Sequence, residues 1–333
     1  MAKIAILGCG YGTALGVLYS TYGHEVTTWT KFEKEAEQLR TEREHKRLLP
    51  GVKLPDNLGV TTDPSCVSGA DIVVVCIPSV FYRDAVRAVK GYISPDTVVV
   101  NASKGLEETT GNRLSQILRE ELPDNRIAVI TGPCHAEEIA RFVPTTEVCA
   151  GYEDGTAEYI QHTLSNECYR IYTNDDVAGC ELGGVLKNPI ALGCGIARGM
   201  ELGDNAVAAL MTRGMTEITR LGVALGANWK TFTGMAGIGD LIVTCTSQHS
   251  RNFRAGYLIG QGMPAAEAVA SVGTVEGYIN SKTAFRLAQE HNIDTPIIEQ
   301  IVNVCYNGKD PRTSIKSLMT RDSRHEREVF WTD

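Results

Sequence analysis

The stretch KIAILGCGYGTAL, which begins at Lys3, is a short apolar run followed by three closely spaced glycines. Its first five residues predict a buried strand, and Gly8, Gly10 and Gly12 predict a tight turn into a helix over Thr13–Ser20. Such glycines let the backbone approach a pyrophosphate, and the N-terminus of the helix offers free N–H groups and a positive dipole end to that anion. The stretch therefore predicts a dinucleotide-binding α/β domain rather than a glycine turn with a purely structural role.

The glycine spacing departs from the usual G-x-G-x-x-G pattern, because the third glycine arrives one residue early. We expect a shortened loop with Tyr11 at its tip. The second predicted strand ends in Trp29-Thr30-Lys31, where an acidic residue would bind the ribose of NAD and a basic one the 2′-phosphate of NADP. No carboxylate follows before Glu33, so Thr30 and Lys31 favour NADP or the use of both cofactors; a solvated surface lysine is the alternative for Lys31.

Apolar runs alternate with helical patterns through the first half of the chain. Most of these runs lack polar alternation, as expected for parallel strands buried on both faces, and they predict a doubly wound, Rossmann-like α/β domain over residues 1–178. Helical spacing prevails afterwards and predicts an all-α substrate and catalytic domain over residues 179–333. The predicted strands are Lys3–Leu7, Glu25–Trp29, Asp71–Ile77, Thr97–Asn101, Arg126–Ile130 and Thr146–Ala150.

The formal charge of the 333-residue chain is -8, from 32 basic and 40 acidic side chains. This balance argues against a general nucleic-acid partner, and it means that an anionic substrate needs a local cluster of basic groups. The 10 cysteines contain no C-x-x-C pair, so we expect no metal site, no disulfide and a reducing, cytoplasmic location. We expect neither a signal peptide nor a membrane span, since no apolar stretch approaches the roughly 20 residues of a membrane helix.

Two polar segments follow the carboxyl ends of predicted strands, where ligands bind in open α/β sheets. In the first, Asn101–Gly105, Lys104 is suited to meet a phosphate or hydroxyl of a substrate; an exposed loop lysine is the alternative. In the second, Gly132–Ala136, the glycine and the proline predict a turn close to the cofactor. Cys134 has no paired catalytic base in the sequence, so the residues alone favour a packing role for it.

Two segments of the helical half also carry chemistry. In Glu181–Asn188, ELGGVLKN, the leucines and the valine form an apolar stripe, and Lys187 lies off it. A lysine on a rigid, partly buried helix is suited to act as an acid or base, the alternative being a surface lysine. The segment Gly237–Asn252 brings a hydroxyl, a guanidinium and an amide together in a set that suits a phosphate, although a structural salt bridge is the alternative for its arginine. Its candidate ligands are Asp240, Ser250, Arg251 and Asn252.

With these residues in hand, the chain resembles the NAD(P)-dependent glycerol-3-phosphate dehydrogenases of bacterial type over nearly its whole length. The resemblance rests on an ordered series of motifs and is therefore specific. The motifs are the glycine turn with Thr13-Ala14-Leu15, Leu49-Pro50-Gly51-Val52-Lys53-Leu54-Pro55, Ile77-Pro78-Ser79, Ser103-Lys104-Gly105, Gly132-Pro133, Leu186-Lys187-Asn188, Gly203-Asp204-Asn205, Thr212-Arg213-Gly214, Gly237-Ile238-Gly239-Asp240-Leu241, Ser250-Arg251-Asn252 and Val275-Glu276-Gly277.

The resemblance implies hydride transfer between C2 of dihydroxyacetone phosphate or sn-glycerol 3-phosphate and the nicotinamide of NADP or NAD, with Lys187 as general acid/base. It also implies a homodimer that supplies glycerol 3-phosphate for glycerophospholipid synthesis. The implied substrate ligands are Lys104, Gly132, Cys134, Asp240, Ser250, Arg251 and Asn252. The expected cofactor ligands, from the residues and the resemblance together, are Gly8, Gly10, Tyr11, Gly12, Thr30, Lys31, Lys104, Ala136, Arg251 and Glu276.

Two further departures from the family pattern lie beside these residues. Cys134 stands where the family often has serine, and Pro189 stands where it usually has a β-branched or small residue. A proline inside a helix removes one backbone hydrogen bond, so we predict a bend beside Lys187. A related two-domain hydroxy-acid dehydrogenase and a non-catalytic nucleotide-sensing protein on the same scaffold are the alternatives.

Overall fold

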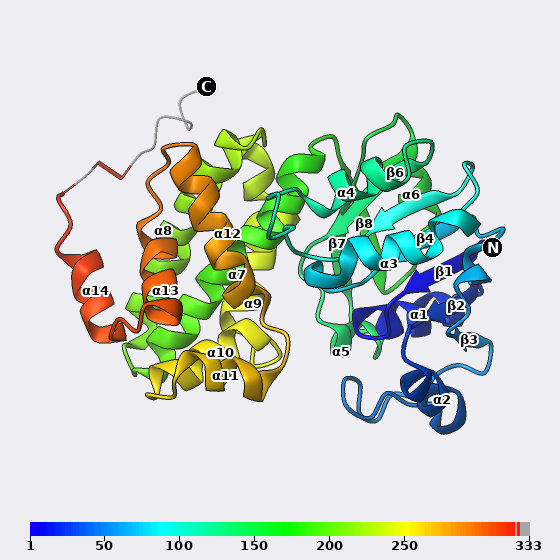
Figure 1. Cartoon of the computed structure of the whole chain (residues 1–333), viewed down its shortest axis with the longest axis horizontal. Helices are drawn as coiled ribbons and strands as arrows, with labels where there is room; N and C mark the ends of the chain where they lie inside the picture. The colour runs from blue at the N-terminus through cyan, green and yellow to red at the C-terminus, as the bar shows by residue number, and fades with distance from the viewer. Residues whose placement is uncertain (324, 327–333) are drawn as a thin grey trace. The chain divides into compact units, whose positions relative to one another are not determined.

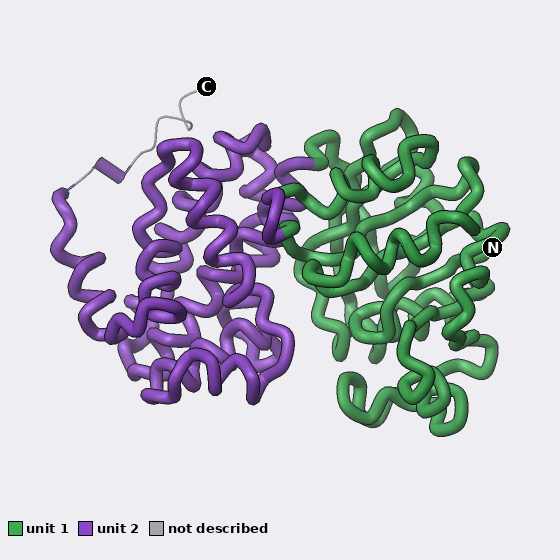
Figure 2. The backbone as a smooth tube through the Cα atoms, in the orientation of Figure 1, with its two compact units in different colours: residues 1–107, 112–177 green, residues 108–111, 178–333 purple. Residues whose placement is uncertain are grey.

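The computed structural model describes residues 1–323, 325 and 326. The chain forms two units, shown in different colours in Figure 2. The first unit holds residues 1–107 and 112–177, and the second holds residues 108–111 together with the described residues from 178 onward. The segment 108–111 belongs to the second unit through its contacts there, since Arg286 Nη2 donates to the carbonyl of Glu108 at 3.2 Å.

The first unit is built on a sheet whose strands follow the order β3-β2-β1-β4-β5-β6-β7-β8 in the described part of the chain (Figure 1). Neighbouring strands run parallel, except that β6 and β7 pair antiparallel. The strand order reverses between β1 and β4, and the carboxyl ends of strands at such a point are where open α/β sheets bind ligands. The strands are β1 (Lys3–Leu7), β2 (Glu25–Trp29), β3 (Leu58–Thr61), β4 (Ile72–Val75), β5 (Val98–Asn101), β6 (Arg126–Thr131), β7 (Thr145–Gly151) and β8 (Tyr169–Asn174).

Helices cover both faces of this sheet. Alternate residues of the strands enter two separate hydrophobic clusters, with Ile4 and Ile6 in one and Ala5 and Leu7 in the other. Full burial of each isoleucine or leucine side chain contributes about 1.5–3 kcal/mol. Both clusters are supplied by helices, so the prediction of a doubly wound α/β fold is confirmed. The helices are α1 (Tyr11–Thr21), α2 (Glu33–Glu42), α3 (Tyr82–Val89), α4 (Leu114–Glu121), α5 (Ala136–Ile139) and α6 (Thr156–Leu164).

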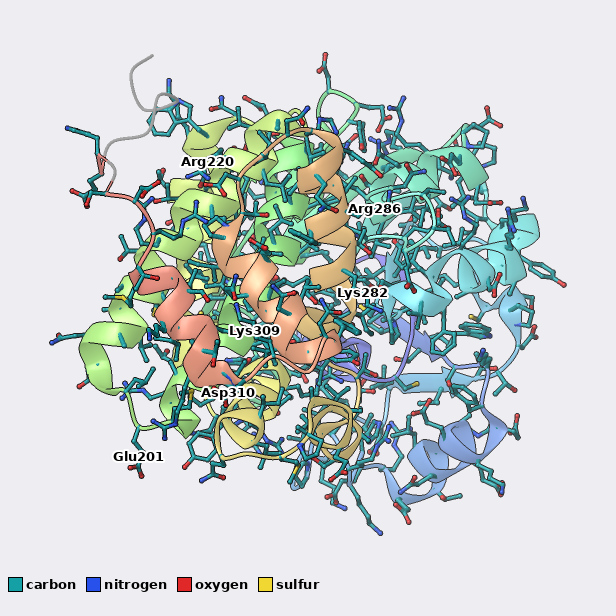
Figure 3. The ribbon with its side chains drawn as sticks, turned by 60° about the vertical axis from the view of Figure 1, so that its left-hand side comes forward. Glu201, Arg220, Lys282, Arg286, Lys309 and Asp310 are labelled. Carbon is teal, nitrogen blue, oxygen red and sulfur yellow. The ribbon has the colours of Figure 1, made fainter. Side chains whose placement is uncertain are left out.

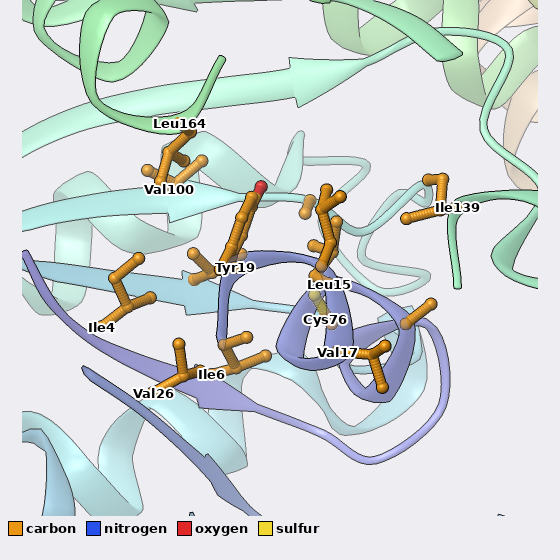
Figure 4. Packing of buried hydrophobic residues seen from close by; sticks show 14 of the residues in the cluster. Ile4, Ile6, Leu15, Val17, Tyr19, Val26, Cys76, Val100, Ile139 and Leu164 are labelled. Atoms are coloured by element: carbon orange, nitrogen blue, oxygen red, sulfur yellow. The ribbon is translucent and has the colours of Figure 1, made fainter. Parts of the chain in front are cut away.

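Helix α1 packs against one face of the sheet along nearly its whole length. Figure 4 shows Leu15 and Tyr19 of this helix beside Cys76, which follows β4, and Val100 of β5. Residues Gly12 to Ser20 of the helix are all buried. Because α1 is held so closely, the glycine turn that precedes it has a defined place at the carboxyl end of β1.

The described residues of the second unit contain helices and no strand, as predicted for the all-α half. The first of them, α7, is buried on every side over residues 179–192 and runs through Pro189 without interruption. A helix that is buried on every side belongs at the centre of a domain. The helices are α7 (Val177–Gly199), α8 (Gly203–Ala224), α9 (Asp240–Thr246), α10 (Arg251–Gly260), α11 (Ala265–Val272), α12 (Glu276–Glu290), α13 (Pro296–Tyr306) and α14 (Pro311–Met319).

Polar contacts join the last helices of this unit. Figure 3 shows Lys282 and Arg286 one turn apart on α12, and the Lys282 Nζ lies 3.8 Å from the centre of the Tyr306 ring on α13. Asp310 begins α14 by accepting the backbone N–H of Thr313 at 2.9 Å. Within residues 1–323, 325 and 326, no helix combines the length and apolar character needed to cross a bilayer.

Candidate active site

The glycine turn after β1 is shaped by close backbone contacts. Gly8 has φ +108°, and a Cβ at this position would lie 2.5 Å from the carbonyl oxygen of Cys76. A Cβ at Gly12 would lie 2.8 Å from Ile6 Cγ2. Gly10 precedes α1 without a side-chain cap, so no capping side chain competes with an anion for the N-terminus of the helix. The geometry therefore suits the pyrophosphate of a dinucleotide, and the role of the three glycines in binding it stays a prediction.

Tyr11 does not lie at the tip of a loop, and this prediction was wrong. It is the first residue of α1, and its hydroxyl donates to Glu147 Oε2 at 2.9 Å. With one residue fewer between the glycines, the helix begins directly after Gly10. The tyrosine is thereby turned toward a buried carboxylate that needs a hydrogen-bond donor.

The residues after β2 have different environments. Thr30 is buried, and its hydroxyl donates to Glu35 Oε2 at 2.6 Å. Lys31 is exposed, and its ammonium lies over the rings of Phe32 and Phe81, at 5.3 and 5.0 Å from their centres. Sequence reasoning overlooked Glu35 as the partner of Thr30. The available signal was a carboxylate five residues after the threonine.

Lys104, Gly132 and Cys134 come together, as expected from two loops that follow neighbouring strands. The ammonium of Lys104 donates to the carbonyl of Gly132 at 2.9 Å and lies 3.3 Å from the sulfur of Cys134. Gly132 has φ +148°, and a Cβ there would lie 3.0 Å from the Cα of Glu147. Ala136 begins the short helix α5 just beyond this turn.

Glu147 of β7 was missed by sequence reasoning. Its side chain is buried, and its carboxylate accepts the hydroxyls of Tyr11 and Tyr169. Burial raises the pKa of Glu147, while the positive charge of Lys104 and the neighbouring hydroxyls act in the opposite direction. The available signal was a lone acidic residue inside the apolar run that forms β7, because an unpaired buried charge is costly.

The second unit contains a buried ion pair. The ammonium of Lys187, on α7, lies 2.9 Å from Asp240 Oδ1, at the start of α9, and their side chains are 5% and 1% exposed. The same ammonium donates to the hydroxyl of Thr244, which in turn donates to the backbone carbonyl of Asp240 at 2.7 Å. Sequence reasoning chose Lys187 and Asp240 separately and missed Thr244, one helical turn after Asp240. A buried charged lysine held in this way is suited to give a proton to an oxygen atom.

The start of α10 is held in place by its own polar groups. Ser250 caps the helix by accepting the N–H of Phe253 at 3.2 Å. Arg251 is the first helical residue and is exposed. Asn252 is nine-tenths buried; its amide donates to Asn188 at 2.9 Å and accepts the N–H of Gly277 at 2.7 Å. Ser250 and Asn252 thus position the helix start, and a helix start with an exposed arginine suits a phosphate.

Helices α7 and α10 approach each other closely through glycines. A Cβ at Gly256 would lie 2.1 Å from the carbonyl oxygen of Leu192, and one at Gly195 would lie 2.1 Å from that of Phe253. Because the two backbones touch, α10 has a defined position relative to the helix that carries Lys187. Glu276, expected to meet the cofactor, begins α12, and its carboxylate accepts the amide of Asn280 at 2.7 Å.

Comparison with known proteins decides the family. Residues 3–157 match the family model described as NAD-dependent glycerol-3-phosphate dehydrogenase N-terminus, and residues 176–316 match the corresponding C-terminus model. The chain is 46% identical over 330 residues to a glycerol-3-phosphate dehydrogenase, NAD(P)+, of Desulfitobacterium hafniense, with 98% of this chain and 94% of that protein covered. The chain belongs to the glycerol-3-phosphate dehydrogenase family. The resemblance predicted from the motifs is confirmed.

Two further glycerol-3-phosphate dehydrogenases agree with this assignment. The protein of that name from Moorella thermoacetica is 49% identical over 329 residues, with 98% of each chain covered. The crystal structure of the enzyme from Coxiella burnetii superposes with a TM-score of 0.92 at 34% identity and covers 96% of this chain and 99% of its own. The family assignment favours a glycerol-3-phosphate dehydrogenase over the related hydroxy-acid dehydrogenases.

Both halves of the glycerol-3-phosphate dehydrogenase match contain candidate site residues. The N-terminal match includes the glycine turn, Lys104 and Cys134, and the C-terminal match includes Lys187 and Arg251. The roles of these residues in binding and catalysis stay predictions. Within the described residues, no cluster of three or more histidine, cysteine, aspartate or glutamate side chains is arranged to hold a metal ion.

Proposed function

We propose that this chain is an NAD(P)-dependent sn-glycerol-3-phosphate dehydrogenase with Lys187 as its general acid/base. The observation that carries the mechanism is the buried ion pair of Lys187 and Asp240, in a chain that belongs to this family. Residues 1–178 act as the dinucleotide-binding domain, and residues 179–333 act as the helical substrate and catalytic domain.

The cofactor belongs to the glycine turn, where Gly8 leaves no room for a Cβ and the N-terminus of α1 presents its N–H groups. When bound, the nicotinamide supplies or accepts the hydride at its C4. Lys31 is exposed at the end of β2, which favours NADP or the use of both NADP and NAD. The proposed cofactor ligands are Gly8, Gly10, Tyr11, Gly12, Thr30, Lys31, Lys104, Ala136, Arg251 and Glu276.

The substrate is dihydroxyacetone phosphate in the reducing direction. As its carbonyl carbon is reduced, negative charge builds on the C2 oxygen; the ammonium of Lys187 stabilises that charge and donates a proton. Asp240 and Thr244 hold the ammonium by hydrogen bonds, so its position is set before the substrate arrives. The phosphate is a remote handle whose binding energy positions the carbonyl. The proposed substrate ligands are Lys104, Gly132, Cys134, Asp240, Ser250, Arg251 and Asn252.

One assay tests the proposal directly. The purified protein is mixed with dihydroxyacetone phosphate and, in separate reactions, NADPH or NADH, and the absorbance of the reduced cofactor is followed. Oxidation of NADPH, or of both cofactors, that depends on dihydroxyacetone phosphate is the expected result. Binding of NADPH without any turnover would contradict the proposal and favour a nucleotide-sensing protein.

The proposal extends to assembly and cellular role. The protein forms a homodimer in the cytoplasm and supplies glycerol 3-phosphate for glycerophospholipid synthesis. Sedimentation equilibrium tests the assembly, and a mass twice the 36.1 kDa of one chain is expected. A mass equal to one chain at the concentrations used for catalysis would contradict the homodimer.

A further inference from the structure

Glu147 lies outside every residue set that the proposed function uses, yet it is among the most deeply buried charged side chains of the first unit. It stands in β7 with 1% of its surface exposed. One of its oxygens, Oε2, accepts the hydroxyl of Tyr11 at 2.9 Å and that of Tyr169 on β8. A buried carboxylate without such donors would be strongly disfavoured, so these contacts are part of its site.

The Tyr11 contact ties two distant parts of the chain together. Tyr11 is the first residue of α1, the helix whose N-terminus faces the pyrophosphate in the proposed function, and Glu147 lies 136 residues further along. The backbone around Glu147 is also fixed, because β7 pairs with β6 and the next residue, Val148, lies opposite Thr131. Glu147 is therefore anchored in the sheet, while Tyr11 stands at the glycine turn.

The same carboxylate lies beside the turn that holds Lys104. A Cβ at Gly132 would lie 3.0 Å from the Cα of Glu147, and the carbonyl of Gly132 accepts the ammonium of Lys104 at 2.9 Å. The positive charge of Lys104 and the thiol of Cys134 both favour the ionised form of Glu147 and oppose the rise in its pKa caused by burial. One side chain of β7 thus adjoins both the glycine turn and the Lys104 turn.

We propose that Glu147 is a positioning residue for the dinucleotide: through the hydroxyl of Tyr11 it fixes the first turn of α1, and it thereby replaces the restraint lost with the missing residue of the glycine turn. The inference rests on the proposed function for its ligand, NADPH or NADH. An anchored helix start loses less conformational entropy when the pyrophosphate binds, so the anchor acts on affinity for the nucleotide. It touches no reacting atom, and hydride transfer itself does not depend on it.

The test changes one hydroxyl or one carboxyl group at a time. Tyr11→Phe removes the hydrogen bond between Tyr11 and Glu147, Glu147→Gln weakens it, and each is expected to raise the dissociation constant for NADPH by about tenfold. Tyr169→Phe is the matched control, because it removes a hydroxyl from the same oxygen but from β8, away from the glycine turn. It is expected to keep the wild-type affinity. Binding is measured by titration calorimetry with NADPH and, in parallel, with NADH.

A double variant separates positioning from general loss of stability. Tyr11→Phe with Glu147→Gln is expected to bind NADPH no more weakly than either single variant, because both act on one contact. The Michaelis constant for the nucleotide rises in all three, and in Glu147→Gln, a change outside every proposed ligand set, kcat at saturating nucleotide keeps its wild-type value. Thermal unfolding followed by circular dichroism accompanies each measurement, and the Tyr11→Phe result stands alone if Glu147→Gln does not fold.

Three results would overturn the inference: unchanged nucleotide affinity in Tyr11→Phe, an equal loss of affinity in Tyr169→Phe, or a fall in kcat with no change in affinity. The binding measurement needs no turnover. A wild-type protein that binds NADPH but does not reduce dihydroxyacetone phosphate therefore refutes the proposed function and leaves this test intact. A wild-type protein that binds neither nucleotide refutes both.

Discussion

At the scale of single residues, the side chain that carries the most weight is Lys187. Its ammonium is buried, paired with Asp240 and hydrogen-bonded to Thr244. For Lys187→Ala we expect kcat to fall by about 10²–10⁴-fold, the usual contribution of a general acid, with the affinity for NADPH unchanged. Steady-state kinetics and nucleotide titration measure the two effects.

The same variant has a cost in stability that must be separated from its catalytic effect. Loss of Lys187 leaves the carboxylate of Asp240 buried without its ion-pair partner, which is expected to cost about 3–5 kcal/mol. Urea unfolding measures this cost. Lys230→Ala, which removes an exposed lysine of the same unit, is the control. It is expected to leave both kcat and the free energy of unfolding unchanged. Full kcat in folded Lys187→Ala would refute the assignment.

Arg251 is exposed at the first position of α10, where its guanidinium can form two parallel hydrogen bonds to a phosphate. For Arg251→Ala we expect the Michaelis constant for dihydroxyacetone phosphate to rise by about 10–100-fold, as for the loss of a hydrogen bond to a charged group. Arg254→Ala removes an exposed arginine three residues further along the same helix and serves as the matched control. Equal Michaelis constants in the two variants would contradict a role for Arg251 in phosphate binding.

At the scale of helices, α13 begins on a buried carboxylate. Glu217 of α8 accepts the N–H groups of Ile297 and Ile298, both at 2.8 Å, and burial raises its pKa from 4.5 to about 8. Between these two values the unfolded chain loses a proton that the native protein keeps, so this group makes the protein less stable as the pH rises.

The effect of Glu217 is isolated by comparing the free energy of unfolding of the wild type with that of Glu217→Gln. Because Gln does not titrate, the free energy of unfolding of wild type minus that of Glu217→Gln is expected to fall between pH 5 and pH 8. Urea unfolding at four pH values in this window measures it, and Glu267→Gln reports the effect of an exposed carboxylate in the same unit. A difference that is constant or rises with pH would show that Glu217 is ionised in the native protein.

The close contact between α7 and α10 predicts how a glycine substitution there changes stability. Replacing a glycine inside a helix by alanine normally adds up to about 1 kcal/mol of stability. For Gly256→Ala we expect the opposite sign, a loss of roughly 1–3 kcal/mol or more, because the new Cβ would lie 2.1 Å from the carbonyl of Leu192. Gly91→Ala, whose Cβ would meet nothing within 4 Å, is the control. Stabilisation by Gly256→Ala in urea unfolding would show that the helices are not so close.

At the scale of the whole molecule, most of the fold could be predicted, because its signals are local. Continuous apolar runs such as the one that became β4 indicate strands buried on both faces, and the structure confirms them. Strands β3 and β8 escaped prediction for a physical reason. Both lie at an edge of the sheet and are buried on one face only: β3 alternates buried with half-buried residues, and β8 alternates buried with exposed ones. Neither therefore has a continuous apolar run.

The site was less predictable, because its contacts join residues far apart in the chain. Lys187 and Asp240 each stood out by composition and motif, but nothing local pairs them. The position of Tyr11 could not be predicted for the same reason, since it depends on Glu147, which lies 136 residues further along the chain. The sequence indicates which side chains have suitable chemistry. Which hydrogen-bond donor meets which acceptor depends on the packing of the whole unit.

The four residues 108–111 make the polypeptide pass between the two units three times instead of once. No single cut of the backbone therefore yields two intact halves. A fragment that starts at residue 178 lacks Glu108, whose carbonyl accepts a hydrogen bond from Arg286. On the ribosome, that piece is made well before the helices that receive it, so the second unit is completed by a piece of chain that emerged in the middle of the first.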